Sequence, residues 1–196
     1  PLLPWAGRTH TSHQVVALDA ATGKELWRFD PGRNKKPLAS GGVNRGVAYW
    51  TDGEDDERIF WGTGNGYLVC VDARTGQPCP DFGPNGSGMV DAMVGIPRAN
   101  RDERDYLNAM LYGIHSPPIV VRDTVIHGSQ VADRRITKEA VPGWVRAWNV
   151  RTGEHSWDFH TVPNSADEFG VDTWQNESWR YSGNANVWSM LAGDNE

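Results

Sequence analysis

The sequence predicts an all-β fold, a β-propeller of four-stranded blades, and three observations support this prediction. First, an eleven-residue unit with the core Asp/Asn-x-x-Thr-Gly starts at residues 17, 70 and 147. Second, apolar runs enter and leave the unit, so each copy is expected to form a hairpin of strand, tight turn and strand. Third, the first two copies start 53 residues apart, near the period of about 40–50 residues that is typical of propeller blades.

The core of the unit has the chemistry of a turn. Asp and Thr side chains hydrogen-bond to the neighbouring backbone, and Gly adopts positive φ angles at little cost. The acidic or amide residue of each copy is therefore expected to cap a turn rather than to bind a metal. These residues are Asp19, Asp72 and Asn149.

In chain order, the pattern divides the sequence into pieces of blade. The first 13 residues are expected to be irregular. A single hairpin follows, then two complete blades separated by an insertion, and the last residues open a further blade. Because propellers typically close with about 4–8 blades, we expect a single incomplete domain, three to four blades of a larger ring. The expected pieces are 14–30, 43–82, 114–160 and 184–196, and the insertion is 83–113.

Composition excludes some classes of function. The formal net charge of −6 gives no support to nucleic-acid binding. No run of 18 apolar residues occurs, so no transmembrane segment is expected. The ten tryptophans are unusual, and each buried indole N–H needs a partner. We therefore expect repeated, defined places where tryptophans dock.

The two cysteines flank the turn of the middle unit. A hairpin centred on residues 74 and 75 sets Cys70 opposite Cys79. Two interpretations remain open from the sequence, a cross-strand disulfide or two half-buried thiols.

Four segments, in this order, resemble the pyrroloquinoline quinone (PQQ)-dependent dehydrogenases. The units Ala-Leu-Asp-Ala-Ala-Thr-Gly-Lys-Glu-Leu-Trp at 17–27 and Ala-Trp-Asn-Val-Arg-Thr-Gly-Glu-His-Ser-Trp at 147–157 look like their tryptophan-docking repeats. Residues 43–50 resemble their cofactor-arginine strand, and residues 115–129 the cofactor blade that follows. Residues 174–190 resemble the segment that carries a cofactor-stacking tryptophan.

This resemblance implies an eight-bladed β-propeller that holds PQQ and Ca²⁺ on its axis. Such enzymes oxidise alcohols or aldose sugars in the periplasm and pass electrons to a quinone or a cytochrome. Trp27 and Trp157 would then dock against neighbouring blades. The chain would be a fragment of the ring, and the family's general-base Asp would fall after residue 196, so no catalytic residue is expected within the chain. Ala39 and Ser40 stand where methanol-oxidising members have two adjacent cysteines.

By resemblance, Arg45 matches the arginine that contacts PQQ, whose three carboxylates and ortho-quinone suit a guanidinium. The alternative is an exposed arginine at the end of a strand. Trp188 would stack against the planar cofactor, and the alternative is another blade-docking tryptophan. Asp133 would ligate Ca²⁺, which prefers carboxylate and carbonyl oxygens, unless it pairs with the arginines that follow it.

The sequence indicates the other expected contacts to PQQ less specifically than it indicates Arg45, Asp133 and Trp188. His115 stands where the family often has Thr, and its alternative is a satisfied core histidine. The full set of these further contacts is His115, Ser116, Gln130, Val131, Ala132 and Asn186.

A second function remains open, a cofactor-free propeller of the same repeats that acts as a protein-interaction scaffold in envelope assembly. Such a ring would lack Arg45, Asp133 and Trp188 and the long loops at 83–113 and 161–182. Their joint presence favours the enzyme. A sensor domain of a receptor kinase has no support in the sequence.

Overall fold

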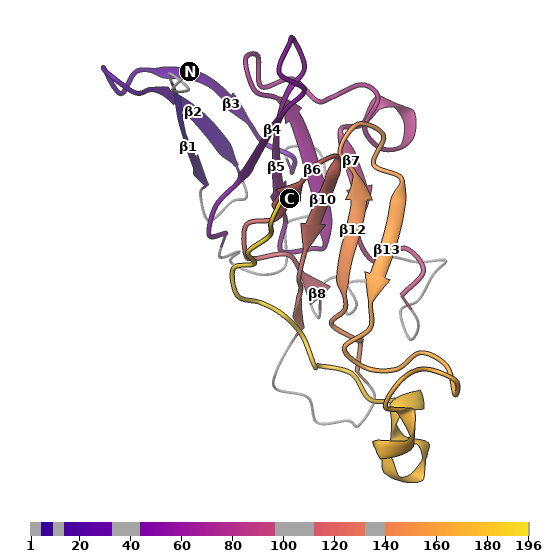
Figure 1. The fold of residues 1–196 in the computed structure, drawn as a ribbon. Helices are drawn as coiled ribbons and strands as arrows, with labels where there is room; N and C mark the ends of the chain where they lie inside the picture. Colours follow the sequence, from indigo (N-terminus) through magenta and orange to yellow (C-terminus); the bar gives the residue numbers. More distant parts are fainter. Residues whose placement is uncertain (1–4, 10–13, 33–43, 97–111, 132–139, 196) are drawn as a thin grey trace.

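The computed structural model describes residues 5–9, 14–32, 44–96, 112–131 and 140–195. These residues form antiparallel β-sheets with three short 3₁₀ helices (Figure 1). Two sheets have four strands each, as expected for propeller blades. Within the described ranges, no helix is long and apolar enough to cross a membrane.

The first sheet has the order β1-β2-β3, with β1 at Trp5–Thr9, β2 at Val15–Asp19 and β3 at Glu25–Phe29. β2 and β3 form the hairpin expected for the first unit, and Gly23 in its turn has a φ of +71°. β1 lies in the stretch that we expected to be irregular. It pairs with β2 through backbone hydrogen bonds. Because such pairing requires no periodic pattern of side chains, the sequence did not indicate this strand.

The second sheet has the order β4-β5-β6-β7. Its strands are β4 (Ala48–Thr51), β5 (Glu57–Gly62), β6 (Tyr67–Asp72) and β7 (Met89–Asp91). The outer strand therefore comes later in the chain than we expected, inside the stretch assigned to the insertion. The reason is Pro78, which has no N–H to extend a ladder and makes only an isolated bridge with β6.

The third sheet has the order β13-β12-β10-β9. Its strands are β9 (Ile119–Val121), β10 (Thr124–His127), β12 (Val145–Asn149) and β13 (His155–Phe159). β12 and β13 flank the turn of the third unit, as expected. Beyond this sheet the chain forms an arm with the 3₁₀ helices η2 (Val171–Thr173) and η3 (Gln175–Arg180), which projects at one end of the molecule (Figure 1).

Tryptophan docking joins the first sheet to the second. The indole N–H of Trp27 donates to the carbonyl of Ala73 at 3.0 Å. A Cβ atom added to Gly76 would lie 2.5 Å from the Trp27 ring, so the ring packs directly on the glycine of the middle unit's turn. Trp27 therefore has the docking role that we expected for it.

The middle unit has no tryptophan at the matching position and contacts the third sheet differently. The N–H of Gly83 donates to the carbonyl of Thr152 at 2.9 Å. A Cβ on Gly153 would approach Val90 to 2.7 Å and Phe82 to 3.3 Å. Phe82 and Val90 thus occupy the place over the turn glycine that an indole takes in the first contact.

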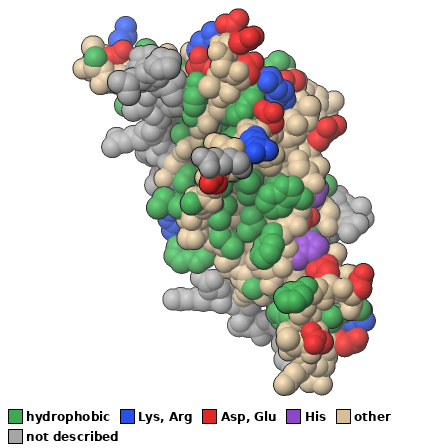
Figure 2. All heavy atoms as spheres, viewed as in Figure 1, with side chains coloured by type: hydrophobic (Ala, Val, Ile, Leu, Met, Phe, Trp, Pro, Cys, Tyr) green, Lys and Arg blue, Asp and Glu red, His purple; other side chains and the backbone are tan. Residues whose placement is uncertain are grey.

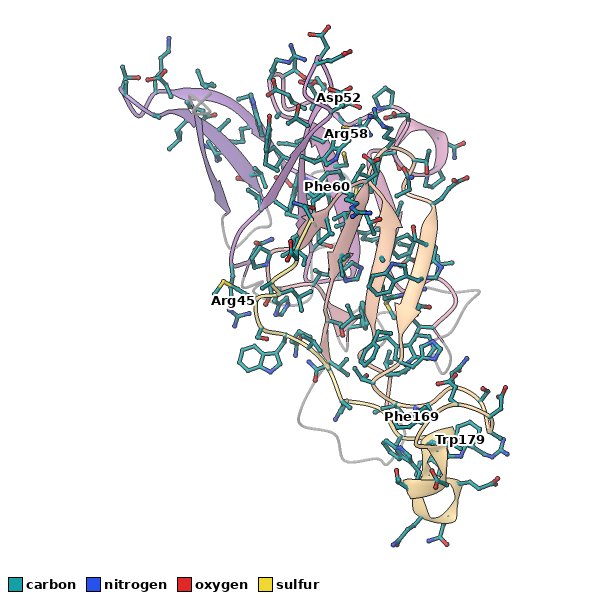
Figure 3. The ribbon with its side chains drawn as sticks, in the orientation of Figure 1. Arg45, Asp52, Arg58, Phe60, Phe169 and Trp179 are labelled. Atoms are coloured by element: carbon teal, nitrogen blue, oxygen red, sulfur yellow. The ribbon has the colours of Figure 1, made fainter. Side chains whose placement is uncertain are left out.

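Two buried arginines also connect the second and third sheets. Arg58, labelled in Figure 3, lies on β5 and donates to the carbonyls of Val150 and Arg151 in the third unit's turn. Arg146 on β12 donates to two carbonyls just after β7. Because buried cations require partners, each also pairs with carboxylates, Arg58 with Asp56 and Asp81, and Arg146 with Asp158.

Candidate functional site

Five of the expected contact residues line one cavity of about 170 Å³. They come from four separate segments of the chain. Arg45, labelled in Figure 3, precedes β4, and His115 precedes β9. Gln130 lies on β11, and the remaining two lie after the arm. The five lining residues are Arg45, His115, Gln130, Asn186 and Trp188.

A tight turn positions Arg45. The Asn44 side chain accepts a hydrogen bond from the Gly46 N–H at 3.0 Å and donates to the carbonyl of Gly62 at 2.7 Å. The Arg45 N–H donates to the carbonyl of His115 at 2.9 Å, which ties the start of one blade to the start of the next. The guanidinium carbon of Arg45 lies 5.1 Å from the centre of the Trp188 ring, a cation–π contact.

His115 lines this cavity and carries a buried polar atom, its Nε2. Its Nε2 has no hydrogen-bond partner among the residues that the structure describes. Burial, followed by the nearby charge of Arg45, lowers the pKa of His115, so the ring is neutral at pH 7. A Cβ on Gly113 would lie 3.0 Å from Nε2. Because an unsatisfied buried nitrogen is costly, the ring is suited to a ligand that supplies the missing bond.

Two small residues, Ser116 and Gly128, support the backbone on either side of Trp188. Ser116, which is only 8% exposed, donates from its hydroxyl to the backbone carbonyl of Trp188. A Cβ on Gly128 would lie 1.9 Å from the carbonyl oxygen of Val187. Ser116 thus supports the Trp188 backbone, and the indole ring itself remains 55% exposed.

Asn186 is held against the third sheet. Its side-chain amide donates to the carbonyl of Ser129 at 2.9 Å, and its backbone makes a parallel bridge with Gly143. A Cβ on Gly143 would lie 2.1 Å from the Cβ of Asn186. Gly128 and Gly143 therefore allow the segment 185–188 to approach the sheet. We did not anticipate their role, although a glycine at the end of a strand often marks such an approach.

Of the remaining expected residues, the structure places Val131 away from the cavity. Val131 on β11 (Gln130–Val131) is fully buried and pairs with Tyr112 on β8 (Tyr112–Gly113), so its side chain faces the core. Ala132 and Asp133 fall outside the described residues. Among the described residues, no cluster of three or more His, Cys, Asp or Glu side chains could hold a metal ion.

A second cavity, of about 530 Å³, lies away from Arg45, beside Asp52. Figure 3 shows that Arg45 and Asp52, which mark the two cavities, lie well apart. Its charged groups compensate one another, since Arg151 pairs with Asp56 at 3.1 Å and the side chain of Arg122 donates to the carbonyl of Asn195. Acidic and basic side chains are interspersed at this end of the molecule (Figure 2). We prefer the smaller cavity, because its cation has no carboxylate among the lining residues.

The chain matches the family model described as "PQQ: Glucose/ethanol/alcohol dehydrogenase, beta-propeller domain" over residues 8–196. The chain belongs to this family. The chain is 32% identical to quinohemoprotein alcohol dehydrogenase ADH IIB of Pseudomonas putida, over 93% of the chain and 24% of the relative. It is also 32% identical to quinoprotein glucose dehydrogenase A of Acinetobacter calcoaceticus, over 94% of the chain and 23% of the relative.

Solved structures agree with the propeller fold. The quinohemoprotein alcohol dehydrogenase ADHIIG of Pseudomonas putida HK5 superposes with a TM-score of 0.57 at 28% identity, over 82% of this chain and 19% of that chain. The chain spans about a quarter of the length of the curated relatives that it matches.

The residues of the cavity fit PQQ chemically. The lining presents one guanidinium, one neutral imidazole, two amides and an exposed indole face, and it contains no carboxylate. Such a set favours a planar, anionic ligand. The volume is below the roughly 300–1,000 Å³ of complete small-molecule sites. This cavity by itself is therefore smaller than a complete site for such a ligand.

Proposed function

We propose that the full-length protein containing this chain is a periplasmic dehydrogenase that oxidises an alcohol or an aldose sugar with PQQ and Ca²⁺. Its electrons pass to a quinone or a cytochrome. One observation carries the proposal. Residues spread from position 45 to position 188 converge on one cavity, and each was expected to contact PQQ. PQQ, when bound, supplies the acceptor for the two electrons removed from the carbinol.

The chain's own residues bind and orient the cofactor. Arg45 binds carboxylate or quinone oxygens through charge-assisted hydrogen bonds. His115 is neutral, and its buried Nε2 completes its hydrogen bonding with a polar atom of the ligand. The exposed face of Trp188 packs against the planar rings. The amides of Gln130 and Asn186 add neutral hydrogen bonds at the edge.

The metal belongs to the stretch that follows β11. We propose that Asp133 ligates Ca²⁺, because a hard cation prefers carboxylate oxygen, and that Ala132 contacts PQQ beside it. The general base that removes the substrate proton belongs to the part of the full-length protein outside residues 1–196.

The test uses the full-length protein, prepared without cofactor and titrated with PQQ in the presence of Ca²⁺. We expect saturable quenching of tryptophan fluorescence, together with reduction of an artificial electron acceptor when alcohols or aldoses are supplied. Chelation of Ca²⁺ should abolish the activity, and added Ca²⁺ should restore it. Absence of both quenching and activity would overturn the proposal and favour the cofactor-free scaffold.

A further inference from the structure

The middle repeat is an interrupted hairpin. In the first and third units the strand entering the turn pairs with the strand that leaves it, β2 with β3 and β12 with β13. In the middle unit the turn forms, with the Asp72 N–H bonded to the carbonyl of Gln77 at 2.9 Å. Only an isolated bridge between Val71 and Pro78 follows. The chain then leaves the sheet and returns as β7.

The two cysteines lie where this ladder stops. Since Val71 is opposite Pro78 in antiparallel register, Cys70 is directly opposite Cys79. The Cys79 N–H donates to the carbonyl of Cys70 at 3.2 Å. The two residues therefore face each other across the end of the ladder, as the partners of a cross-strand disulfide do.

The side chains have the matching arrangement. Both cysteines are free thiols in the structure, with the two sulfur atoms 3.0 Å apart. Cys70 is fully buried and Cys79 is 4% exposed, so neither is one of the half-buried thiols considered from the sequence. Both belong to the apolar core that also contains Phe82 and Val90. The sulfur atoms are about 1 Å further apart than the roughly 2.05 Å of a disulfide bond, so a small shift joins them.

We propose that Cys70 and Cys79 form a structural disulfide that closes the middle repeat. The bond forms by thiol–disulfide exchange with a disulfide oxidant of the thioredoxin-fold class. The two cysteine thiols lose two electrons and two protons, and the oxidant's disulfide becomes a dithiol. Because an external oxidant cannot reach the buried sulfurs, the exchange takes place before folding is complete. This inference does not depend on the proposed cofactor.

The disulfide substitutes for the strand that the middle repeat lacks. Residues 73–88 leave β6 and must return so that β7 can pair with it. The disulfide holds the first part of this loop, residues 73–88, against β6. At the end of the loop, the Cys70 N–H donates to the carbonyl of Gly88 at 2.8 Å. Phe82 and Gly83, which contact the third unit's turn, lie within this loop. The bond therefore supports the contact between the second and third sheets.

Peptide mapping tests the bond directly. The full-length protein is isolated from an oxidising compartment with free thiols alkylated, and is then digested with trypsin without reduction. Cleavage after Arg58, Arg74 and Arg98 separates Cys70, in 59–74, from Cys79, in 75–98. We expect a linked pair of these peptides that separates on reduction. Recovery of both peptides singly and alkylated would overturn the proposal, as would linkage of either to another cysteine.

Thermal unfolding of the same protein provides a second test. Closing a short loop with a disulfide stabilises the fold, so a reductant that reaches the bond in mild denaturant should lower the unfolding temperature by several degrees. The double variant Cys70→Ala/Cys79→Ala should show no response to the reductant. An equal response in the double variant would assign the effect to other cysteines and contradict the structural role.

Discussion

Arg45 and Trp188 illustrate how single residues make the site. The indole is 55% exposed, although the chain buries most of its large apolar side chains. The guanidinium lies over that ring, 5.1 Å from its centre. A guanidinium beside an open aromatic face offers charge and a flat apolar surface together, which suits a planar anionic ligand. The pair therefore provides the most direct place to test binding.

Replacing Arg45 by Ala should weaken PQQ binding by about 10–100-fold, since a hydrogen bond to a charged group contributes about 1.5–3 kcal/mol. The measurement is a fluorescence titration of the full-length protein with PQQ and Ca²⁺. Arg28→Ala is the matched control, because Arg28 makes only exposed contacts, with Glu25 and Gln14, on the first hairpin. Equal affinities for the two variants would contradict the role of Arg45.

The environment of a second residue, His127, changes its pKa and so makes the stability of the fold depend on pH. It is fully buried on β10, with Nδ1–H donating to the carbonyl of Gly128 at 2.9 Å and Nε2 accepting from the Trp148 indole at 3.0 Å. Burial, chiefly, lowers the pKa of His127 to about 4. Both ring nitrogens are used by the neutral form, so protonation would break the bond from Trp148.

The stability due to neutral His127 should be complete above pH 6.5, its usual pKa when unfolded. It should fall as the pH drops from 6.5 toward 4, because the unfolded chain takes up the proton first. The loss can reach about 3 kcal/mol. Unfolding temperatures at pH 7 and pH 5 measure it. The variant His127→Gln keeps an acceptor for Trp148, and its unfolding temperatures at the two pH values should differ less than those of the unmodified protein. If they differ by the same amount, protonation of His127 is not the cause.

At the scale of elements, the turn glycines have two distinct roles. Gly23 and Gly76 occupy the same position in their units and have φ angles of +71° and +70°. A Cβ on Gly23 would meet nothing within 4 Å, whereas a Cβ on Gly76 would overlap the Trp27 ring. The same sequence motif thus serves as a turn in one copy and as a docking surface in the next.

Gly23→Ala and Gly76→Ala separate these roles. Both should be destabilised by about 1–2 kcal/mol from the left-handed backbone. Gly76→Ala should lose about 1–3 kcal/mol more, because the added methyl displaces Trp27. Urea unfolding of the full-length variants gives the comparison. If the two variants lose the same stability, Trp27 does not dock on the middle turn.

The repeat pattern did not predict the position of the outer strand of the second sheet. The repeat indicated a strand directly after the middle turn, yet Pro78 stops the ladder and Met89–Asp91 pairs instead. Three residues with one inward-facing side chain carry too short a pattern to be recognised. The third sheet lies wholly within the expected piece 114–160 and has four strands, as a complete blade requires.

At the scale of the whole molecule, contacts between blades follow one direction along the chain. Trp27 docks on the turn of the next unit, and Phe82 and Val90 pack on the turn of the third. Trp157 holds the position in the third unit that Trp27 holds in the first, yet it is 42% exposed. Since the chain spans about a quarter of its relatives, a further blade in the full-length protein is the expected partner of Trp157.

Trp157→Ala should therefore destabilise the full-length protein about as much as Trp27→Ala does, by about 2–4 kcal/mol, because each removes a large docked side chain. Thermal or urea unfolding of both variants measures the two losses. A loss at Trp27 without one at Trp157 would show that the third unit does not dock onward.

The sequence by itself determined the repeat, its turns and the family, because turn chemistry and strand alternation are local properties of neighbouring residues. It also indicated the residues of the candidate site one by one, through their resemblance to the family. Only the tertiary structure decided that Arg45, His115, Gln130, Asn186 and Trp188 share one cavity. It alone placed Ser116 under Trp188 and Val131 in the core. These outcomes depend on how closely Gly128 and Gly143 let one backbone approach another, a property of distant pairs that no local pattern records.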